Sequence, residues 1–409
     1  MKILFVSHYF PPEVNAPANR THEHCRRWVN DGHEVTVITG VPNHPRGRIF
    51  EGYTNRWIQE ETVDGIRVLR TWMYLTPNAG FLRRVANYLL FALTATLASL
   101  RAERPDVVVA TSPQFFVGIA GAIIAKIKRR PFVLEIRDLW PKSIVELGQL
   151  GPGPILSGLE ALEGWLYRSA AGIVVNTRTF HDHITAHGVA SESIELVYNG
   201  IDPAVFKPRP KNRELLARHG LADRFTVAYV GTLGLAHGLI LLVDVAERLA
   251  PRSEIHFVLI GDGADREKIE AEVEKRGLRN FHMLGLQPRD AMPDWIASID
   301  VLLVMLRDLP VFETVIPSKI FEFLAQERPV ILSAKGEIRR MMEEAGGALV
   351  IDPEVADQLV AAIEEVIAHP EEAALRAASG RRYVEGGFQR DDLARKMSAF
   401  LERVVREQV

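Results

Sequence analysis

Short runs of apolar, often β-branched residues recur along the first half of the chain. Most are separated by segments in which apolar residues follow a helical spacing, and the runs occupy residues 2–6, 33–39, 66–72, 106–112, 132–138, 172–177 and 194–199. A strand that is apolar on both faces tolerates water on neither, so such strands belong in a parallel sheet covered by helices on both sides. The first half therefore predicts a doubly wound α/β domain.

The same alternation starts again in the second half. Its apolar runs occupy residues 226–231, 255–261, 281–285, 301–306, 329–334 and 348–352. Between the halves, prolines and charged residues interrupt both periods near residues 202–212 and indicate a linker. The fold class predicted is α/β, with two Rossmann-like doubly wound domains that face each other across a cleft. The final segment, 386–409, predicts a helix that is able to cap either domain.

Charge and cysteine content narrow the classes of partner and compartment. The 49 basic and 52 acidic side chains nearly balance, so the chain has no general attraction to nucleic acid, and none is expected as a partner. Cys25 is the single cysteine, which excludes an internal disulfide and a thiolate metal cluster. The chain enters a strand-like run directly from Met1, without the pattern of a secretory signal, so we expect a cytoplasmic protein.

Ligands of doubly wound sheets bind beyond the carboxyl ends of the strands. In the second half, Gly231 begins a loop that we expect to open the first helix, and Gly261 and Gly263 follow the next strand. Glycine lets the backbone approach an anion, and a helix N-terminus adds free N–H donors. Ordinary tight turns explain these glycines equally well.

The segment from Ile316 to Glu322 is a more informative candidate for an anion site. Pro317 and Ser318 suit a helix start, and Lys319 adds a cation there. The helix N-terminus and the lysine would then both stabilise the charge of a bound phosphate. Glu322 lies about one helical turn beyond Ser318, on the same side, where its carboxylate is able to accept hydrogen bonds from ribose hydroxyls. The alternative is a capping pattern with a solvated Glu322.

In the first half, Glu135, Arg137 and Asp138 bring charge to the carboxyl end of the strand at 132–138. A base or a hydrogen-bond acceptor for an incoming hydroxyl fits this position. The alternative is an ion pair that holds the following loop. The loop after the first strand, residues 7–19, contains no glycine, so the pyrophosphate fingerprint of an NAD dehydrogenase is absent there.

Two pairs of histidines, His22 with His24 and His181 with His183, are candidates for metal ligands. The members of each pair are two residues apart, which places them on different sides of a helix. We therefore expect no metal site.

The most apolar helical candidate occupies residues 85–100. It is shorter than the roughly 20 residues that a membrane span needs, and it contains Asn87 and Thr94. We therefore expect this helix not to cross a membrane.

Basic residues lie beside this apolar helix and beside a second one. Arg83 and Arg84 precede the first, and a basic cluster at 126–130 ends the second. Cations next to exposed apolar surface suit anionic lipid head groups, so the region 81–100 predicts an anionic membrane surface as a partner. For residues 126–130 the favoured alternative is charge matching at a helix C-terminus.

Several longer motifs carry a resemblance to a known family. They are SHYFPPEVNAPANR, GHEVTVITGVPNHPRG, RDLWPKS, NGID with Phe206 and Pro208, YVGTLGLAHGL, GDG, and IPSKIFEFLA before RPVI. Along essentially its whole length the chain resembles the family-four retaining glycosyltransferases of GT-B fold. It is similar above all to bacterial surface-polysaccharide transferases, including N-acetyl-L-fucosamine transferases.

The resemblance implies that the second domain, 202–385, binds a nucleotide-sugar donor. It also implies that the first domain, 1–201, binds the acceptor, and that the last helix, 386–409, returns to the first domain. The donor-binding residues so implied are Gly231, Thr232, Gly261, Gly263, Leu286 near the base, Ser318, Lys319 and Glu322 at the ribose. The implied acceptor-binding residues are Pro12, Asn19, Arg137 and Asp138, and the catalytic ones are Asp138, Lys319 and Glu322.

The chain departs from the family pattern at a carboxylate. Glu322 matches the second carboxylate of the family's Glu-x7-Glu motif, but Thr314 occupies the first position. Glu313 is adjacent to it. The usual carboxylate near the donor sugar is therefore missing.

Further departures affect the cations of the family site. The Arg and Lys that hold the donor phosphates correspond here to Thr232 and His237, which leaves Lys319 as the natural substitute. The frequent His of the acceptor-side motif is replaced by Arg137, with Asp138 as its charged neighbour.

The function implied is retaining transfer of a sugar from a uridine diphosphate donor to a lipid-linked or glycan acceptor in surface-polysaccharide biosynthesis. No metal ion and no other cofactor is expected. One alternative is a UDP-sugar epimerase of the same architecture, which needs no acceptor. Another is a sugar-nucleotide binding protein without turnover, which Thr314, Thr232 and His237 suggest.

Overall fold

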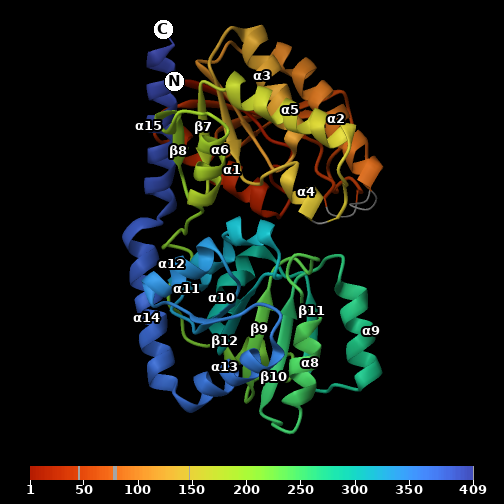
Figure 1. Cartoon of the computed structure of the whole chain (residues 1–409), viewed down its shortest axis with the longest axis vertical. Helices are drawn as coiled ribbons and strands as arrows, with labels where there is room; N and C mark the ends of the chain where they lie inside the picture. Colours follow the sequence, from red (N-terminus) through yellow and green to blue (C-terminus); the bar gives the residue numbers. More distant parts are fainter. Residues whose placement is uncertain (45–46, 77–80, 147, 409) are drawn as a thin grey trace. The chain divides into compact units, whose positions relative to one another are not determined.

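The computed structural model describes residues 1–44, 47–76, 81–146 and 148–408 (Figure 1). The chain forms two compact units, Met1–Tyr198 with Arg390–Val409, and Asn199–Gln389. Sequence analysis placed the corresponding boundaries at residues 201 and 386. Each unit contains a doubly wound sheet, which confirms the predicted class of two Rossmann-like α/β domains.

The first unit contains an eight-stranded sheet in the order β3-β4-β2-β1-β5-β6-β7-β8. Seven strands coincide with predicted apolar runs and pair in parallel: β1 (Lys2–Val6), β2 (Glu34–Gly40), β4 (Ile66–Thr71), β5 (Val107–Thr111), β6 (Phe132–Ile136), β7 (Gly172–Val175) and β8 (Ile194–Leu196). The apolar pattern does not predict β3 (Ile58–Val63), which pairs antiparallel with β4. Its sequence, IQEETV, mixes polar with apolar residues because an edge strand is partly exposed.

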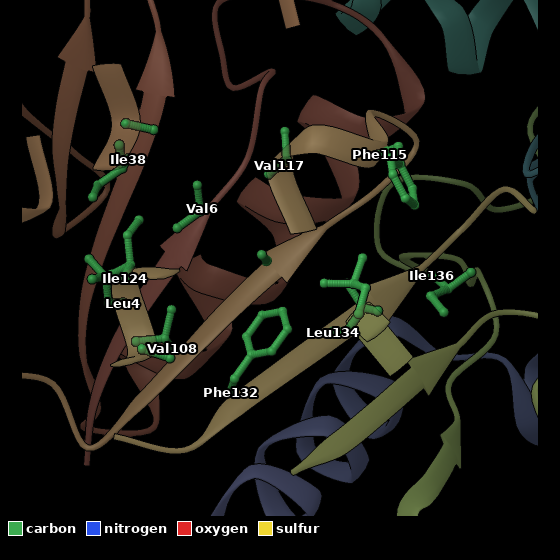
Figure 2. Packing of buried hydrophobic residues seen from close by; sticks show 14 of the residues in the cluster. Leu4, Val6, Ile38, Val108, Phe115, Val117, Ile124, Phe132, Leu134 and Ile136 are labelled. Carbon is green, nitrogen blue, oxygen red and sulfur yellow. The ribbon is translucent and has the colours of Figure 1, made fainter. Parts of the chain in front are cut away.

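Both faces of this sheet are buried, as the continuous apolar runs predict. Along β1, Ile3 and Phe5 belong to one core cluster, whereas Leu4 and Val6 belong to the cluster on the other face. Figure 2 shows part of the second cluster, where Leu4 lies close to Ile124 of a covering helix. Because alternate residues of a strand face opposite sides of the sheet, each strand contributes to two separate cores.

Helices of the first unit cover these two faces. They are α1 (Ala16–Asn30), α2 (Phe81–Ala98), α3 (Phe115–Lys128), α4 (Lys142–Glu146), α5 (Pro154–Ser169), α6 (Arg178–Ala186) and α15 (Arg390–Glu407), with short 3-10 turns at Ser99–Arg101 and Ser191–Ser193. The last helix, α15, packs against α1, where Trp28 Nε1 donates a hydrogen bond of 3.0 Å to the Ala394 carbonyl. Segments from the two ends of the chain thus share one core.

The second unit contains a six-stranded, fully parallel sheet in the order β11-β10-β9-β12-β13-β14. The strands coincide with the predicted runs: β9 (Phe225–Val230), β10 (Ile255–Ile260), β11 (Phe281–Gly285), β12 (Val301–Met305), β13 (Val330–Ser333) and β14 (Leu349–Ile351). The first strand, β9, lies between the second and the fourth. The strand order reverses here, and the loops after these strands form the edge at which ligands bind in such sheets.

The two longest helices of the second unit are the last two in its sequence. The helices of this unit are α7 (Arg213–Ala217), α8 (Leu241–Arg248), α9 (Arg266–Arg276), α10 (Met292–Ser298), α11 (Lys319–Ala325), α12 (Glu337–Ala345), α13 (Ala356–Ala368) and α14 (Pro370–Gly387), with 3-10 turns at Arg289–Ala291 and Pro310–Thr314. Across both units, none of the described helices combines the length and apolar character needed to cross a membrane.

Candidate functional site

The loops that follow β9 and β10 pack backbone against backbone at the carboxyl edge of the second sheet. The Gly231 N–H donates to the Ile260 carbonyl at 2.8 Å, and the Leu233 N–H donates to the Asp262 carbonyl at 3.0 Å. A Cβ on Gly261, whose φ is +144°, would lie 1.9 Å from the Gly231 carbonyl oxygen. The approach of the two loops therefore requires glycine at Gly261 even without a ligand.

The prediction that the Gly231 loop opens the first helix of this unit is wrong. Helix α8 begins only at Leu241. Between them, the His237 N–H donates to the Gly234 carbonyl at 3.0 Å in a turn, and Gly238 has a left-handed φ of +61° that a helix does not accommodate. This loop therefore offers no helix N-terminus to an anion.

Lys319 brings a cation directly to the Gly231 loop. Its Nζ lies 3.6 Å from the centroid of the Tyr229 ring, and a Cβ on Gly231 would lie 2.8 Å from the same nitrogen. The nitrogen is buried and has no hydrogen-bond partner among the described residues. The cation–π contact compensates by only about 0.5 to 2 kcal/mol, which leaves the buried ammonium without its usual hydrogen bonds.

Burial lowers the pKa of Lys319 to about 7, and the nearby Glu322 carboxylate opposes this shift. Glu322 therefore lies close enough to Lys319 to act on its charge. An anion placed at the same nitrogen would favour the protonated lysine further. The structure thus brings together three residues that the sequence predicts for the donor: Gly231, Lys319 and Glu322.

Two positions that carry cations in the family do not do so here. Thr232 is exposed, and its carbonyl accepts a 2.9 Å hydrogen bond from the Tyr229 hydroxyl. His237 uses Nδ1 to donate to the Met305 carbonyl at 2.9 Å. Burial and the neighbouring Lys319 lower the pKa of His237 to about 3, so this imidazole is neutral at pH 7.

The helix start at α11 differs in one detail from the expected cap. Ser318 occupies the N-cap position, but its side chain makes no capping hydrogen bond and its backbone is already helical. The side-chain part of the alternative capping pattern is therefore absent, while the helix itself begins at Lys319 as expected. Ser318 remains a candidate contact for a phosphate.

Thr314 does not substitute for the missing carboxylate. It is buried, and its hydroxyl donates to the Val311 carbonyl at 2.6 Å, three residues earlier in a 3-10 turn. Glu313 is exposed on the same turn. Because Gly336 packs against the Glu313 backbone, with a Cβ there only 2.0 Å from the carbonyl oxygen, the turn is held in place by α12.

The two remaining donor candidates lie in the loops after β10 and β11. Gly263 follows β10, and a Cβ there would lie 2.3 Å from the Leu233 carbonyl oxygen, so this glycine also serves loop packing. Leu286 directly follows β11 and is 60% exposed. An exposed leucine at the carboxyl end of a strand is available to cover a flat ligand surface.

In the first unit, Glu135 lies within β6 and Arg137 and Asp138 follow it, but the ion pair formed here differs from the expected one. Glu135 forms a buried ion pair with Arg20 of α1, with 2.8 Å between Nε and Oε1. Arg20 also donates to the carbonyls of Val197 and Tyr198, each at 2.8 Å. The ion pair that holds the chain here thus joins α1 to β6, and the sequence analysis missed Arg20.

Burial alone would raise the pKa of Glu135, but Arg20 and Arg137 outweigh burial and lower this pKa to about 2. Arg137 has two buried guanidinium nitrogens, Nε and Nη1, without a hydrogen-bond partner among the described residues. Its backbone N–H donates to Ser112 Oγ at 2.7 Å. The side chain therefore offers unused donors at the carboxyl edge of the first sheet.

Asp138 lies beside Arg137 in the sequence and is half-buried. The Ser143 hydroxyl donates to its Oδ2 at 3.3 Å, and burial raises the pKa of Asp138 to about 6. Of the other acceptor candidates, Pro12 is exposed in the loop after β1, and Asn19 lies half-buried on α1. The first unit thus holds a titratable carboxylate and unpaired N–H donors after β6.

The sequence analysis also missed buried polar residues after β1. His8 has no partner for Nδ1 among the described residues and lies against the rings of Tyr9 and Tyr88. Glu13 accepts hydrogen bonds from the backbone N–H groups of Asn43 and His44, at 2.9 and 2.8 Å. Both lie inside the SHYFPPEVNAPANR motif, and polar residues in a loop after a buried strand were the available signal.

The members of each predicted histidine pair contact different neighbours, as their spacing of two predicts. His183 contacts His187, four residues later, with ring centroids 4.4 Å apart, while His181 bonds to Ser191 Oγ at 3.1 Å. His24 is buried, and His22 lies 2.7 Å from an Asp64 oxygen. The i, i+4 spacing of His183 and His187 was the signal that the comparison of His181 with His183 overlooked.

Two family descriptions match successive parts of the chain. The description "glycosyl transferase 4-like domain" matches residues 15–200, and "glycosyl transferases group 1" matches residues 212–382. The first match covers most of the first unit and ends two residues beyond Tyr198, and the second lies within the second unit. Together they include every strand of the two sheets except β1.

Two relatives align over most of the chain. WcaI, a glycosyl transferase assigned to colanic acid biosynthesis in Escherichia coli strain K12, is 25% identical over 408 residues, which are 97% of this chain and 98% of that protein. The 2-deoxystreptamine glucosyltransferase of Streptomyces kanamyceticus is 25% identical over 330 residues, 78% of this chain and 82% of that one.

A solved structure shares the fold. The crystal structure of Anabaena HepE in complex with UDP-glucose superposes with a TM-score of 0.72 at 18% identity, covering 98% of this chain and 100% of HepE. At this identity the likeness concerns the arrangement of strands and helices.

Proposed function

This chain belongs to the glycosyltransferases that join a glycosyl transferase 4-like domain to a group 1 domain, and we propose that it is a retaining enzyme with a uridine diphosphate sugar as donor. The proposed acceptor is lipid-linked or a glycan, in surface-polysaccharide biosynthesis. The colanic acid assignment of WcaI and the UDP-glucose bound to HepE support these choices. The mycobacterial relatives named GDP-mannose-dependent mannosyltransferases make GDP the competing nucleotide.

The observation that carries the proposal is the buried Lys319 ammonium beside Gly231. A buried ammonium without hydrogen bonds is unfavourable, and a diphosphate would supply both the charge and the acceptors. Its position against the loop after β9, next to Glu322, is where a Rossmann-like sheet binds a nucleotide. Glu322 is then within reach of the ribose hydroxyls.

The proposed reaction replaces one bond at the anomeric carbon with another on the same face. The bond to the diphosphate oxygen breaks, the acceptor oxygen bonds to the carbon, and a leaving phosphate oxygen takes up the hydroxyl proton. Lys319 stabilises the charge that grows on the diphosphate. The Asp138 carboxylate, ionised at pH 7, accepts a hydrogen bond from the acceptor hydroxyl and orients it. With a lysine in this role, no divalent metal is needed.

Arg137 favours an acceptor that itself carries phosphate. Its two buried, unpaired nitrogens are available to donate hydrogen bonds to the oxygens of a phosphate, an anion that a guanidinium binds well. A lipid-linked acceptor with a phosphate or diphosphate therefore fits this unit better than a neutral glycan.

Helix α2 supports a peripheral association with the cytoplasmic face of a membrane. Its exposed leucines, Leu89, Leu93 and Leu97, recur every four residues and form one stripe. Arg83 is exposed at the start of the helix, and the side chains of residues 81 and 82 lie outside the described part of the region. We propose that this stripe inserts at the head-group level of an anionic lipid surface, where a lipid-linked acceptor is found.

The proposal is tested by calorimetry and by nucleotide release. UDP should bind the wild type and bind Glu322→Gln more weakly, because a ribose contact is similar in ground and transition states. UDP release from a UDP-sugar should require an acceptor. Release of no nucleotide under any condition would indicate a binding protein, and interconversion of UDP-sugars without acceptor would indicate an epimerase. Binding of GDP with no binding of UDP would overturn the donor assignment.

A further inference from the structure

Three side chains of the first unit, Glu163 from α5, His183 from α6 and His187 at the C-cap of α6, place ligand atoms within 4.8 Å of one another. We propose that they form a binding site for a divalent transition-metal ion of the zinc class. The proposal is independent of the donor site, whose residues all belong to the second unit.

The two histidines are spaced as metal-binding pairs on helices are. His187 comes four residues after His183, at the C-cap of α6, so the two rings lie on one side, with centroids 4.4 Å apart. The His187 Nδ1–H donates to the His183 carbonyl at 2.8 Å, which leaves Nε2 with its lone pair outward. Such a hydrogen bond from the second ring nitrogen fixes tautomer and orientation in metal sites.

His183 supplies an observation that points to a ligand. Its Nε2 is buried and has no hydrogen-bond partner among the described residues. The nearest carboxylate oxygen, Glu163 Oε1, lies 4.0 Å away, too far for a hydrogen bond. Buried polar nitrogens are normally satisfied, so an ion between the two groups would complete both.

Glu163 is oriented as an oxygen ligand is expected to be. Its side chain is 7% exposed, and Oε1 accepts a 2.6 Å hydrogen bond from the Tyr167 hydroxyl one turn later on α5. The carboxylate is therefore held in place through the same oxygen that faces His183. Glu163 also lines a cavity of about 20 Å³ together with Asp138, which has room for about one water.

The chemistry of the set selects the class of ion. Two imidazoles and one carboxylate suit zinc and its neighbours, whereas magnesium and calcium prefer oxygen ligands alone. Zinc bonds of about 2.0 to 2.2 Å place tetrahedral ligands about 3.4 Å apart, so small side-chain rotations would close this site. The nearby cation, Lys142, lies 3.9 Å from Glu146 and is 44% exposed, so solvent screens its repulsion.

The site is tested with Co²⁺ and Zn²⁺ on the whole chain. We expect one equivalent of Co²⁺ to bind with a visible absorption band of low coordination number, and Zn²⁺ to displace it and raise the Tm by a few degrees. His187→Ala removes an exposed side chain and should lower Zn²⁺ affinity at least about tenfold, as should Glu163→Gln.

His181→Ala is the matched control, because it removes an imidazole from the same helix without removing a ligand. It should leave Zn²⁺ affinity unchanged. Equal Zn²⁺ affinity in the wild type and both ligand variants would overturn the proposal, and so would the absence of binding in the wild type. The latter result would leave a direct interaction of His183 with Glu163 as the explanation of their proximity. Neither result bears on UDP binding, so the two proposals fail separately.

Discussion

At the scale of single residues, a variant of Lys319 tests whether this cation acts in catalysis or only in the structure. A charge-assisted hydrogen bond to phosphate is worth about 1.5 to 3 kcal/mol, and more where charge grows in the transition state. Lys319→Ala should therefore lower turnover at least about tenfold, since about 1.4 kcal/mol corresponds to that factor. The Tm of the unliganded protein should not fall, because the ammonium has no hydrogen bond to lose.

Lys335→Ala provides the control for this variant. Lys335 is an exposed lysine of the same unit, paired with Asp308 at 2.7 Å, and its loss should leave turnover unchanged. Normal turnover of Lys319→Ala would show that another group neutralises the phosphate.

The lowered pKa of Lys319 also predicts a pH dependence of stability. Between its folded pKa of about 7 and the unfolded value of 10.5, the unfolded chain holds a proton that the folded chain has released. The unfolding free energy therefore rises with pH in this window, and the destabilisation is fully present below pH 7.

Comparison with Lys319→Met isolates this effect. From pH 6 to pH 9 the wild type should gain about 2 to 3 kcal/mol relative to the variant, measured by thermal unfolding without ligand. A constant difference in Tm across this range would mean that Lys319 titrates as an ordinary lysine.

At the scale of elements, one buried ion pair connects α1 to the sheet of the first unit. Removing one partner of such a pair leaves an uncompensated charge and costs about 3 to 5 kcal/mol. Glu135→Gln should therefore lower the Tm of the first unit strongly, because Arg20 remains buried. Glu60→Gln breaks the exposed pair with Arg67, at 2.6 Å, and should cost less than about 1 kcal/mol. If the two variants lower the Tm equally in calorimetry, the buried pair of Arg20 with Glu135 stabilises the unit no more than an exposed pair does.

Helix α2 has polar residues inside and leucines outside. Asn87 donates to the Tyr74 carbonyl at 2.5 Å and Thr94 donates to the Trp72 carbonyl at 3.2 Å, whereas the leucine stripe faces outward. Because apolar surface beside cations favours anionic lipid, the Arg83, Arg84→Glu double variant should float less well on anionic liposomes.

The control is a Lys268, Lys275→Glu double variant. It changes the charge equally on α9, a helix with no exposed large apolar side chain among its described residues. Equal flotation of the wild type and the Arg83, Arg84→Glu variant would remove α2 as the lipid contact.

At the scale of the whole molecule, donor binding and metal binding are proposed for different units. The proposed donor residues lie in the second unit, and the proposed metal ligands lie in the first. EDTA should therefore leave turnover nearly unchanged, because Lys319 neutralises the diphosphate without a metal. Loss of turnover in EDTA, restored by magnesium or manganese, would contradict the metal-independent reaction. A lower Tm in EDTA with full turnover would instead be the expected sign of the metal site.

The sequence by itself determined the strand positions and the class of the fold, because continuous apolar runs need burial on both faces. This reasoning does not predict the edge strand β3, since an exposed edge does not require an apolar run. The sequence also located Lys319 and Glu322 at a helix start, because local backbone preferences set that boundary.

Only the tertiary structure decided which side chains meet. Arg20 and Glu135 are 115 residues apart in the chain, and no local pattern predicts their pairing. The same holds for Glu163 with His183, and for the Lys319 ammonium against Tyr229 and Gly231. These contacts depend on the order of strands in the sheet, which brings together loops from distant parts of the chain, and spacing along the sequence does not encode that order.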